Sequence, residues 1–332
     1  MNMPSAVTGS EGAQCRISDA SGRARVSIGV PVFNGARYLE DCLDSLVAQR
    51  YADLEILISD NASTDRTSII CHAYCKRDPR IRYYRQQRNI GAAANYNFLV
   101  RQATGEFFKW AAHDDVCTPD FVARCVAALE ASPTAVLAFG RAGFIDDGGA
   151  PLHGYDVPIR WSNHEAAFDR LREQLAIPGA ALQHMCTRQF GVLRRDALLR
   201  TSLIRSHPAS DLVLMVELAL LGGLVEVEER LFFVRLHESS SLRANQSATD
   251  VARWYDPRSG DRYPLRWTRV LTGYGAAVLS SSLSRRERVG GLLLIARWLT
   301  VDENWRIIGG ELKRRLLGLV HQYHPSRAVQ RS

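Results

Sequence analysis

Three carboxylates are the residues of this 332-residue chain that are best placed to do chemistry. Asp60 follows the apolar run Leu54–Ser59, and the pair Asp114 and Asp115 follows the apolar run Phe107–Ala111. Carboxylates that lie close together repel one another, and a bound cation removes that repulsion. Oxygen ligands favour Mg²⁺ or Mn²⁺, and such an ion keeps positions open for phosphate oxygens. The pattern therefore predicts a divalent-cation site for a phosphorylated ligand; the alternative is that these acids only cap helices.

Regularly spaced apolar residues predict the elements that would position these carboxylates. Short β-branched runs predict buried strands, and apolar residues at helical spacing predict helices between them. The expected strands are Val26–Val32, Leu54–Ser59, Ile81–Arg85, Phe107–Ala111 and Ala135–Gly140, and the expected helices are Tyr38–Gln49, Thr64–Lys76, Ala92–Gln102 and Thr118–Ala131. Thr64 or Asp65 is expected to cap the second helix, and Thr118 with Pro119 the fourth. This alternation predicts a parallel α/β sheet with right-handed crossovers.

A polar cluster follows each of the first four expected strands. The clusters are Phe33–Gly35, Asp60–Asp65, Arg88–Gly91 and His113–Asp115. In a parallel sheet the carboxyl ends of the strands lie at one edge, where ligands bind. We therefore expect the four clusters to form one site. The first turn contains neither G-x-G-x-x-G nor G-x-x-x-x-G-K-[ST], which weakens the case for a dinucleotide-dependent dehydrogenase or a P-loop enzyme.

Beyond Gly140 the alternation of strands and helices weakens. A hairpin is expected at Phe144–Pro151, with glycine at its turn. Further strands are expected at Phe190–Leu193, Leu224–Val227 and Leu231–Leu236, and helices at Arg195–Thr201 and Asp211–Leu221. Three amphipathic helices are expected after them, at Tyr263–Leu283, Arg286–Leu299 and Glu303–Leu319.

The basic residues of the chain are concentrated near its C-terminus. The chain has 42 Lys and Arg against 35 Asp and Glu, yet residues 251–332 alone contain 15 basic and 6 acidic residues. A nucleic-acid-binding core would spread positive charge over the main domain, so this distribution argues against nucleic acid as a partner. The basic helices predict peripheral contact with an anionic membrane or with another subunit, and a solvated helical face is the alternative.

The remaining composition indicates a cytoplasmic globular protein. Seven cysteines without a preceding signal peptide are typical of reduced thiols. Residues 1–25 have no apolar core and are expected to be a disordered lead. Uninterrupted apolar runs stay below the roughly 18 residues that a membrane-spanning helix needs. We therefore expect a cytoplasmic chain that either is free or rests on the inner face of the membrane.

Four motifs taken together resemble the nucleotide-sugar half of the family 2 glycosyltransferases. They are PVFN at Pro31–Asn34, DNASTD at Asp60–Asp65, RNIGAAANYN at Arg88–Asn97 and HDDVCTPDFV at His113–Val122. The resemblance continues in FGVLRRDALLRT at Phe190–Thr201, SDLVLMVELALLGG at Ser210–Gly223 and LFFVRLHESSS at Leu231–Ser241. It implies a GT-A fold: a Rossmann-like, mostly parallel sheet flanked by helices, with a C-terminal helical extension. It also implies a domain over residues 26–245, with a nucleotide-sugar half (26–140) and an acceptor half (141–245), before a basic helical extension (246–332).

The resemblance also implies a role for individual residues of this sequence. Nucleotide-sugar contacts are implied for Pro31, Val32, Phe33, Asn34, Asp60, Arg88, Asn89, Gly91, Asn95 and Asp114. Asp115 and His237 are implied as ligands of Mn²⁺ or Mg²⁺, and Asp211 as the catalytic base. From the residues alone, an N-terminal helix cap is favoured for Asp211, and a packed or solvated histidine for His237. Gln183, His184 and Arg188 are candidates for contact with the acceptor.

The reaction that the resemblance implies is inverting transfer of one sugar from a nucleotide diphosphate to a hydroxyl group. UDP is the commonest nucleotide of the family, and the acceptor would be a glycan, a lipid-linked or a small molecule. The chain has no Q-x-x-R-W segment, so a processive polymerase is disfavoured. It departs from the family where His113-Asp114-Asp115 replaces D-x-D and Ser210-Asp211 replaces Glu-Asp. The alternatives are a catalytically silent glycan- or membrane-binding module, and a nucleotidyltransferase, whose Gly-rich first loop is absent.

Overall fold

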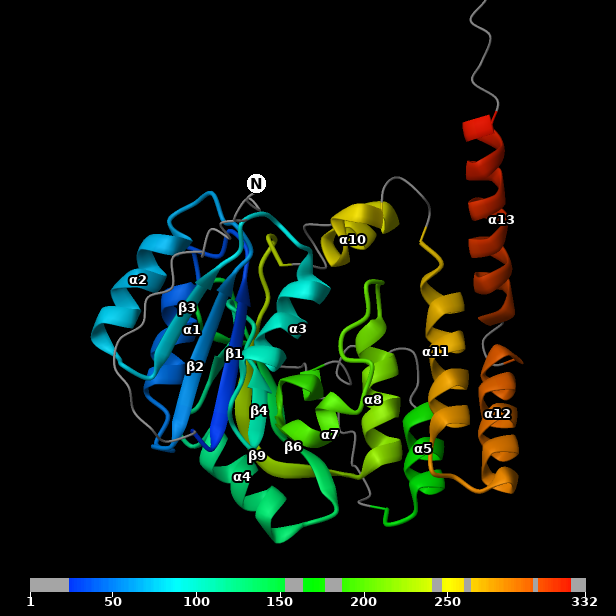
Figure 1. Ribbon diagram of the computed structural model, residues 1–332, viewed down its shortest axis with the longest axis horizontal. Coiled ribbons are helices and arrows are strands. Elements are labelled where there is room, and N and C mark those ends of the chain that lie inside the picture. The colour runs from blue at the N-terminus through cyan, green and yellow to red at the C-terminus, as the bar shows by residue number, and fades with distance from the viewer. Residues whose placement is uncertain are drawn as a thin grey trace, which may run out of the picture.

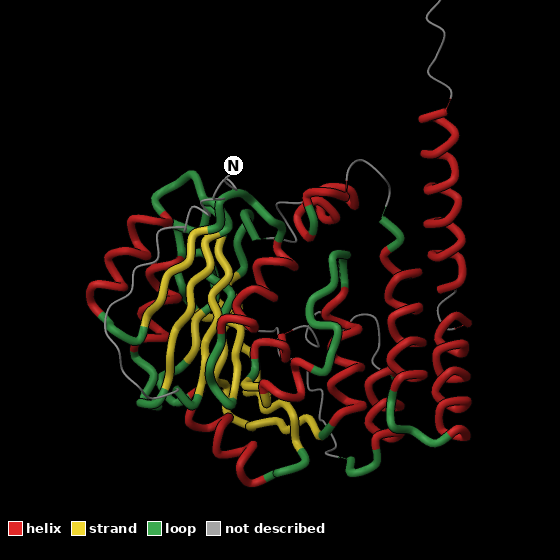
Figure 2. The backbone as a smooth tube through the Cα atoms, viewed as in Figure 1, coloured by secondary structure: helices red, strands yellow, loops and turns green. Residues whose placement is uncertain are grey.

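A computed structural model describes residues 24–152, 164–176, 187–240, 247–259, 264–300 and 304–323. Over these residues the chain forms one twisted, nine-stranded sheet with helices against both of its faces (Figures 1 and 2). Across the sheet the order of the strands is β3 (Ile81–Arg85), β2 (Leu54–Asp60), β1 (Val26–Val32), β4 (Phe107–Trp110), β8 (Val192–Arg194), β6 (Ala135–Ile145), β9 (Gly223–Arg235) and β5 (Val116–Cys117). The short strand β7 (Pro151–Leu152) pairs with β6. This mixed, mostly parallel α/β architecture confirms the predicted fold class.

The first four strands are the predicted parallel unit. They are β1 (Val26–Val32), β2 (Leu54–Asp60), β3 (Ile81–Arg85) and β4 (Phe107–Trp110), and β1 lies between β2 and β4. In the register, Val32 at the end of β1 pairs with Asp60 at the end of β2. The polar clusters that follow the four strands therefore lie at one edge of the sheet, as the sequence predicts.

Side chains of the strands alternate between two hydrophobic cores. Ile56 and Ile58 pack into one core and Leu57 into the other, as the two-residue period of a strand requires. The first core contains buried faces of α1 (Leu39–Val47), α2 (Thr67–Arg77) and α4 (Phe121–Ala131). The second contains those of α3 (Ala92–Gln102), α7 (Arg195–Leu199) and α8 (Ser210–Leu221). The sheet edge is thus held rigidly from both faces.

The beginning of α4 differs from the prediction. Thr118 and Pro119 do not begin the helix, which starts at Phe121 after Asp120. The reason is long-range pairing: β5 (Val116–Cys117) pairs with β9, and the backbone N–H of Thr118 donates to the carbonyl oxygen of Leu231 at 2.9 Å. The chain is thus paired with the sheet up to Thr118, and α4 begins only after the turn at Pro119 and Asp120.

The second half extends the sheet. β6 (Ala135–Ile145) turns into β7 (Pro151–Leu152) as the predicted hairpin, with Gly149 at a φ of +90°. After α5 (Ala167–Leu175) and the short helix η2 (Thr187–Phe190), β8 (Val192–Arg194) pairs antiparallel with both β4 and β6. The two strands expected at Leu224–Val227 and Leu231–Leu236 are one strand, β9 (Gly223–Arg235), whose register against β6 shifts in the middle.

The C-terminal helices follow: α10 packs on α3, α11 and α12 pack beside α8 and α5, and α13 packs on α11 and α12 (Figure 1). They are α10 (Ala248–Tyr255) with the short helix η3 (Pro257–Ser259), then α11 (Arg266–Ser280), α12 (Arg285–Thr300) and α13 (Asn304–Tyr323). The buried carboxylate of Glu311 accepts hydrogen bonds from the N–H groups of Trp267 and Thr268 at 3.0 and 3.1 Å, so α13 supplies the N-terminal acceptor for α11. Within the described residues, no helix is long and apolar enough to span a membrane.

Candidate active site

Side-chain hydrogen bonds join the first two polar clusters at the sheet edge. The backbone N–H of Asn34 donates to Oγ of Ser63, and Oδ1 of Asn34 accepts from the N–H of Thr64, both at 2.8 Å. Asn34 has a positive φ of 51°, a conformation that asparagine tolerates better than most residues. The side chain of Phe33 is 40% exposed beside this junction. The loops after β1 and β2 therefore form one rigid rim.

A second asparagine bridge joins the clusters that follow β2 and β3. Nδ2 of Asn61 donates to Oδ1 of Asn89 at 2.9 Å, and Oδ1 of Asn61 accepts from the N–H of Ile90 at 2.8 Å. Asn95 has a supporting role behind them, because its amide pairs with both Oγ and the carbonyl oxygen of Ser59, at 2.6 and 2.9 Å. Arg88 and Asn89 are exposed on the rim. Asn61 and Ser63 are rim residues that the motif matches did not single out.

Asp60 is completely buried at the end of β2. Its Oδ1 accepts from the N–H of Ser63 at 2.7 Å, and its Oδ2 accepts from the hydroxyl of Tyr83 at 2.7 Å and from Nη1 of Arg85 at 2.9 Å. Both oxygens are therefore engaged. Because Asp60 is fully buried, the nucleotide-sugar contact implied for it requires a rearrangement that opens its carboxylate to the ligand.

The pair Asp114 and Asp115 meets the histidine after β9. Oδ2 of Asp114 lies 3.0 Å from Nε2 of His237, and Oδ1 of Asp115 accepts from the backbone N–H of Arg235 at 2.9 Å. Burial, followed by the negative charge of Asp114, holds the pKa of Asp115 well above its usual range. Burial acts in the same direction on Asp114, but the charges of His113 and His237 and the hydrogen bond from His237 outweigh it and lower the pKa of Asp114.

These residues offer a partial set of cation ligands. Among the described residues, no three His, Cys, Asp or Glu side chains lie close enough together to form a complete protein cage. His237 is buried, and its Nδ1 has no hydrogen-bond partner in the described part of the chain. Mg²⁺ is typically bound by one or two carboxylates together with substrate phosphates. The donor set therefore fits a cation that the protein binds jointly with a phosphorylated ligand.

Arg235 holds this cluster together, and it was not among the residues that the sequence motifs predicted for the site. Only 2% of its side chain is exposed. Its guanidinium donates to the carbonyl oxygens of Asp114 and Asp147, both at 3.0 Å, and to Oδ2 of Asp41 at 2.8 Å. Its place two residues before His237 in the last motif is the one signal that could have found it.

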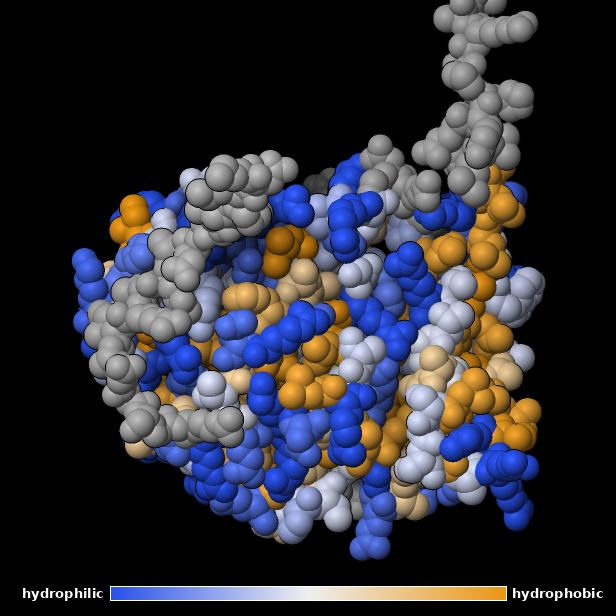
Figure 3. All heavy atoms as spheres, viewed as in Figure 1, coloured by the Kyte–Doolittle hydropathy of each residue, from blue (hydrophilic) through white to orange (hydrophobic). Residues whose placement is uncertain are grey.

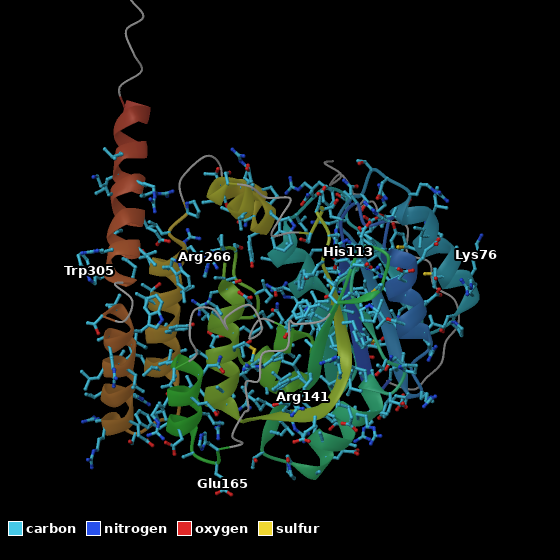
Figure 4. All side chains as sticks on the ribbon, turned by 180° about the vertical axis from the view of Figure 1, so that it is seen from behind. Lys76, His113, Arg141, Glu165, Arg266 and Trp305 are labelled. Atoms are coloured by element: carbon cyan, nitrogen blue, oxygen red, sulfur yellow. The ribbon has the colours of Figure 1, made fainter. Side chains whose placement is uncertain are left out.

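The remaining carboxylate, Asp211, belongs to the second half of the chain. It lies in the first turn of α8, and Ala209, just before the helix, has a left-handed φ of 61°. Burial raises the pKa of the partly buried Tyr96, and the negative charges of Asp114, Asp115 and Asp211 raise it further. Tyr96 belongs to α3, so the charges of carboxylates from two separate segments act on one hydroxyl. In Figure 4, seen from behind, the neighbouring His113 lies over this edge of the sheet.

The acceptor candidates are only partly described. Gln183 and His184 lie outside the described residues. Arg188 lies in η2 and is 4% exposed, with its guanidinium carbon 5.3 Å from the ring centre of Phe139. It therefore packs inside the second half rather than on an open surface. Pro31 and Val32 are likewise buried, as part of β1.

Gly91 lets the segment around α10 approach the sheet edge. Its φ is +86°, and a Cβ atom built there would lie 2.5 Å from the carbonyl oxygen of Tyr255 and 2.7 Å from Cδ of Pro257. Figure 1 shows α10 above this end of the sheet, beside α3. A side chain at position 91 would therefore conflict with the backbone of Tyr255.

We expect Gly91→Ala to impair the site more than an ordinary turn substitution does. Gly149→Ala is the matched control, because Gly149 also has a positive φ, of +90°, but its nearest neighbour would be 3.6 Å away. The control should cost about 1 kcal/mol of unfolding free energy from backbone strain. Gly91→Ala should cost at least about 2 kcal/mol and expose α10 to proteolysis. Equal melting temperatures and equal cleavage rates for the two variants would show that the contact with Tyr255 is unimportant.

The fold and this edge together define a GT-A type of protein: a parallel nucleotide-binding half with an acidic pair beyond β4, joined to a second half of mixed parallel and antiparallel strands. The chain belongs to glycosyl transferase family 2, whose family model matches residues 27–199. This confirms the family that the sequence motifs indicate.

Individual relatives match about a third of the chain. Glycosyltransferase GlyG of Streptococcus pneumoniae is 32% identical over 97 residues, which is 29% of this chain and 32% of that protein. An uncharacterized glycosyltransferase of Rickettsia typhi, RT0329, is 37% identical over 95 residues, or 29% of each chain. The matches thus span about a third or less of the length of these curated relatives.

Among solved structures, the chain resembles residues 1–349 of TarS from S. aureus in complex with UDP-GlcNAc. The match covers 84% of this chain and 73% of that 1–349 chain, with a TM-score of 0.62 and 15% sequence identity. This likeness shows a common fold.

Proposed function

We propose that this protein transfers one sugar from a nucleotide-diphosphate sugar to an acceptor hydroxyl, with inversion and with the help of a divalent cation. The observation that carries the proposal is the pair Asp114 and Asp115 beside His237 at the sheet edge, together with Asp211, whose negative charge acts with those of the pair on Tyr96. Two of these acids come from the nucleotide-sugar half and one from the acceptor half. That arrangement suits a reaction whose two substrates are held by different halves.

The chemistry requires a base and a positive charge at opposite ends of the transferred sugar. A carboxylate takes the proton from the attacking hydroxyl, and a Mn²⁺ or Mg²⁺ ion supplies Lewis-acid stabilisation of the leaving diphosphate. We assign the base to Asp211, which lies in the first turn of α8. We assign the cation ligands to Asp115 and His237. Oδ1 of Asp115 is oriented by the N–H of Arg235, and His237 would offer Nδ1, since its Nε2 faces Asp114.

The donor is proposed to be a UDP-sugar. The TarS structure contains UDP-GlcNAc on the same fold, and the rim of Phe33, Asn34, Arg88 and Asn89 is exposed at the corresponding end of the parallel strands. A screen of nucleotide sugars by thermal shift, with and without Mn²⁺, tests this. A ligand at 100 times its Kd should stabilise the fold by about 2.7 kcal/mol. If no nucleotide diphosphate binds in Mn²⁺, the chain is instead a catalytically silent binding module.

The C-terminal helices are proposed to rest on an anionic membrane, which would place the protein at the inner face of the membrane. Large apolar side chains are exposed on α12 and α13: Leu293 is 65%, Leu316 63% and Trp305 56% exposed. Apolar residues gather along these helices in Figure 3, and Trp305 lies on the outer side of α13 in Figure 4. Basic residues flank them at Arg285, Arg286, Arg288, Arg297, Arg306, Lys313, Arg314 and Arg315. An apolar face bordered by positive charges matches the interface of an anionic bilayer.

Co-sedimentation with vesicles tests this membrane contact. The wild type should bind phosphatidylserine-containing vesicles more tightly than neutral ones, and added salt should weaken binding. Leu316→Ser should reduce the affinity about 10-fold, since a buried leucine contributes about 1.5–3 kcal/mol. Ile69→Ser is the control, because Ile69 is 62% exposed but lies on α2. Equal losses for both variants, or binding that ignores lipid charge, would contradict the proposal.

A further inference from the structure

Tyr38, the residue directly before α1, packs against the imidazole ring of His237. The two ring centres are 4.4 Å apart, and the ring planes are tilted by 51°. Each residue is 5% exposed, so the contact is buried. Tyr38 belongs to the nucleotide-sugar half of the chain and His237 to the acceptor half. The contact therefore joins the two halves beside the acidic pair.

The ring of His237 has one edge toward Asp114. Its Nε2 lies 3.0 Å from Oδ2 of Asp114, and its Nδ1 is buried without a hydrogen-bond partner among the described residues. When Nε2 donates its proton to the carboxylate, Nδ1 of the neutral ring keeps the lone pair that a metal ion needs. Histidine ligands of metals usually donate their other N–H to a carboxylate or carbonyl in this way. The useful orientation of His237 is therefore the one that keeps Nε2 on Asp114.

The hydrogen bond to Asp114 alone does not fix this orientation. The torsion about the Cβ–Cγ bond of histidine is broad, and a turn of the ring by about 180° exchanges each nitrogen with a carbon. Tyr38 covers one face of the imidazole in a buried contact, which a turning ring would have to push aside. A tilted aromatic pair at this distance is also attractive beyond its burial. The ring of Tyr38 therefore supplies the second restraint that the histidine needs.

Tyr38 is itself held by the turn between β6 and β7. Its hydroxyl donates to Oδ1 of Asp147, and the guanidinium of Arg37 pairs with the other oxygen of the same carboxylate. Burial, followed by the hydrogen bond to Asp147, raises the pKa of Tyr38 to about 12, so the hydroxyl keeps its proton and stays a donor at neutral pH. The guanidinium carbon of Arg235 lies 5.0 Å from the ring centre. The ring of Tyr38 is thus fixed at its hydroxyl as well as on its face.

The turn that carries Asp147 is closed by its own hydrogen bonds. Oδ1 of Asp146 accepts from the N–H groups of Gly148 and Ala150, at 2.9 and 2.8 Å. The N–H of Asp146 in turn donates to the carbonyl oxygen of Ala150 at 2.9 Å. Asp146 therefore shapes the turn, and Asp147 connects it to Tyr38.

We propose that Tyr38 is a positioning residue for His237, the proposed cation ligand. The ring of Tyr38 keeps Nε2 of His237 on Asp114 and Nδ1 turned away from it, and the hydroxyl holds the ring in place through Asp147. Tyr38 acts through His237 and does not itself bind the cation. The inference rests on the proposed function, because it concerns how a cation ligand of that same site is oriented.

Nuclear magnetic resonance of the metal-free protein tests the orientation directly. The full chain is labelled with nitrogen-labelled histidine and kept in EDTA, and a long-range proton–nitrogen spectrum shows which ring nitrogen of His237 carries the proton. The signal is assigned by its loss in His237→Gln. The wild type should carry the proton on Nε2. Tyr38→Leu, which removes the aromatic ring, should move both nitrogen shifts toward the average of the two tautomers, whereas Tyr38→Phe, which keeps the ring, should stay close to the wild type.

Tyr74→Leu is the matched control for the loss of a buried tyrosine. Tyr74 is 4% exposed, its hydroxyl donates to Oδ1 of Asp44 at 2.6 Å, and the guanidinium carbon of Arg77 lies 4.8 Å from its ring centre. The surroundings are therefore of the same kind as those of Tyr38, but Tyr74 lies on α2 and packs in the first core. The spectrum of His237 in Tyr74→Leu should match that of the wild type.

Calorimetry of UDP at increasing Mn²⁺ concentration tests the consequence for the cation. Tyr38→Leu should need about 10-fold more Mn²⁺ than the wild type to reach the same affinity for UDP, as expected when the support of a metal ligand is lost. Tyr38→Phe should recover most of this difference. In a His237→Gln background, Tyr38→Leu should cause no further loss, because both changes act on the same ligand.

The two measurements distinguish failure of the inference from failure of the proposed function. The inference is overturned if Tyr38→Leu keeps the wild-type tautomer of His237, or if Tyr38→Leu and Tyr74→Leu have equal effects. An additive loss of Mn²⁺ affinity in the His237→Gln background overturns it as well. If Tyr38→Leu releases the ring but the wild type shows no Mn²⁺-dependent affinity for UDP, the proposed function fails and the orienting contact stands.

Discussion

Asp211→Asn should lower kcat by about 10²–10⁴-fold, while the affinity for the nucleotide sugar changes little. Asparagine keeps the shape of the side chain and its capacity to accept a hydrogen bond in the first turn of α8, but it cannot accept the proton of the attacking hydroxyl. The measurement is steady-state release of nucleoside diphosphate with the donor found in the thermal-shift screen. Donor affinity is measured separately, by calorimetry in Mn²⁺.

The control for this variant is Asp169→Asn. Asp169 also lies in the first turn of a helix, α5, so its replacement removes the same charge from the same kind of position. If Asp211 only stabilises its helix, both substitutions should cost about 0.3–1 kcal/mol of unfolding free energy and leave kcat unchanged. Full activity of the Asp211→Asn protein would therefore rule out the assignment of the base.

Asp115→Asn should abolish the part of donor binding that depends on the cation. The amide is a weaker ligand than the carboxylate, and it removes one negative charge from a buried cluster. We expect the affinity for the donor in Mn²⁺ to fall by about 10²-fold, to the level that the wild type shows in EDTA. The turnover should fall with it. Calorimetric titration of the donor, with Mn²⁺ and with EDTA, measures both states.

Two further variants separate metal binding from simple disruption. Asp120→Asn removes an exposed carboxylate five residues away, whose partner is Arg50, and should leave the response to Mn²⁺ intact. Asp114→Asn breaks the contact with His237 and tests which carboxylate of the pair the cation requires. If Asp115→Asn retains a Mn²⁺-dependent gain in donor affinity and Asp114→Asn does not, the ligand is Asp114.

Much of the sheet edge could be predicted because its pieces are local in sequence. An apolar run of five to seven residues followed by a polar cluster is visible without any partner, and four such units in order predict a parallel sheet. Parallel pairing then requires Asn34, Asp60, Asn89 and Asp114 to lie at one edge. The motifs that contain these residues resemble those of the family 2 glycosyltransferases, and the family model confirms that the chain belongs to this family.

Element boundaries were less predictable wherever a distant strand pairs with the chain next to a helix. The sequence predicts a helix that begins at Thr118 and Pro119, but α4 begins at Phe121. Just before it, Val116 and Cys117 pair with β9, and the N–H of Thr118 donates to the carbonyl oxygen of Leu231. This pairing satisfies backbone groups that would otherwise lack partners, and its partner strand is distant in sequence, so local residues do not reveal it.

The amino-acid sequence determined which chemical groups end each strand, because side-chain alternation and helix periodicity depend on neighbours within a few positions. It did not reveal how those groups are held. Arg235 appears as one charge in an apolar strand, and its role depends on Asp41, which is 194 residues away. In the sequence Gly91 looks like an ordinary turn glycine. In the fold, a side chain at this position would collide with the carbonyl oxygen of Tyr255. These features arise only when the folded chain brings distant segments into contact, since burial and charge pairing act across space and not along the sequence.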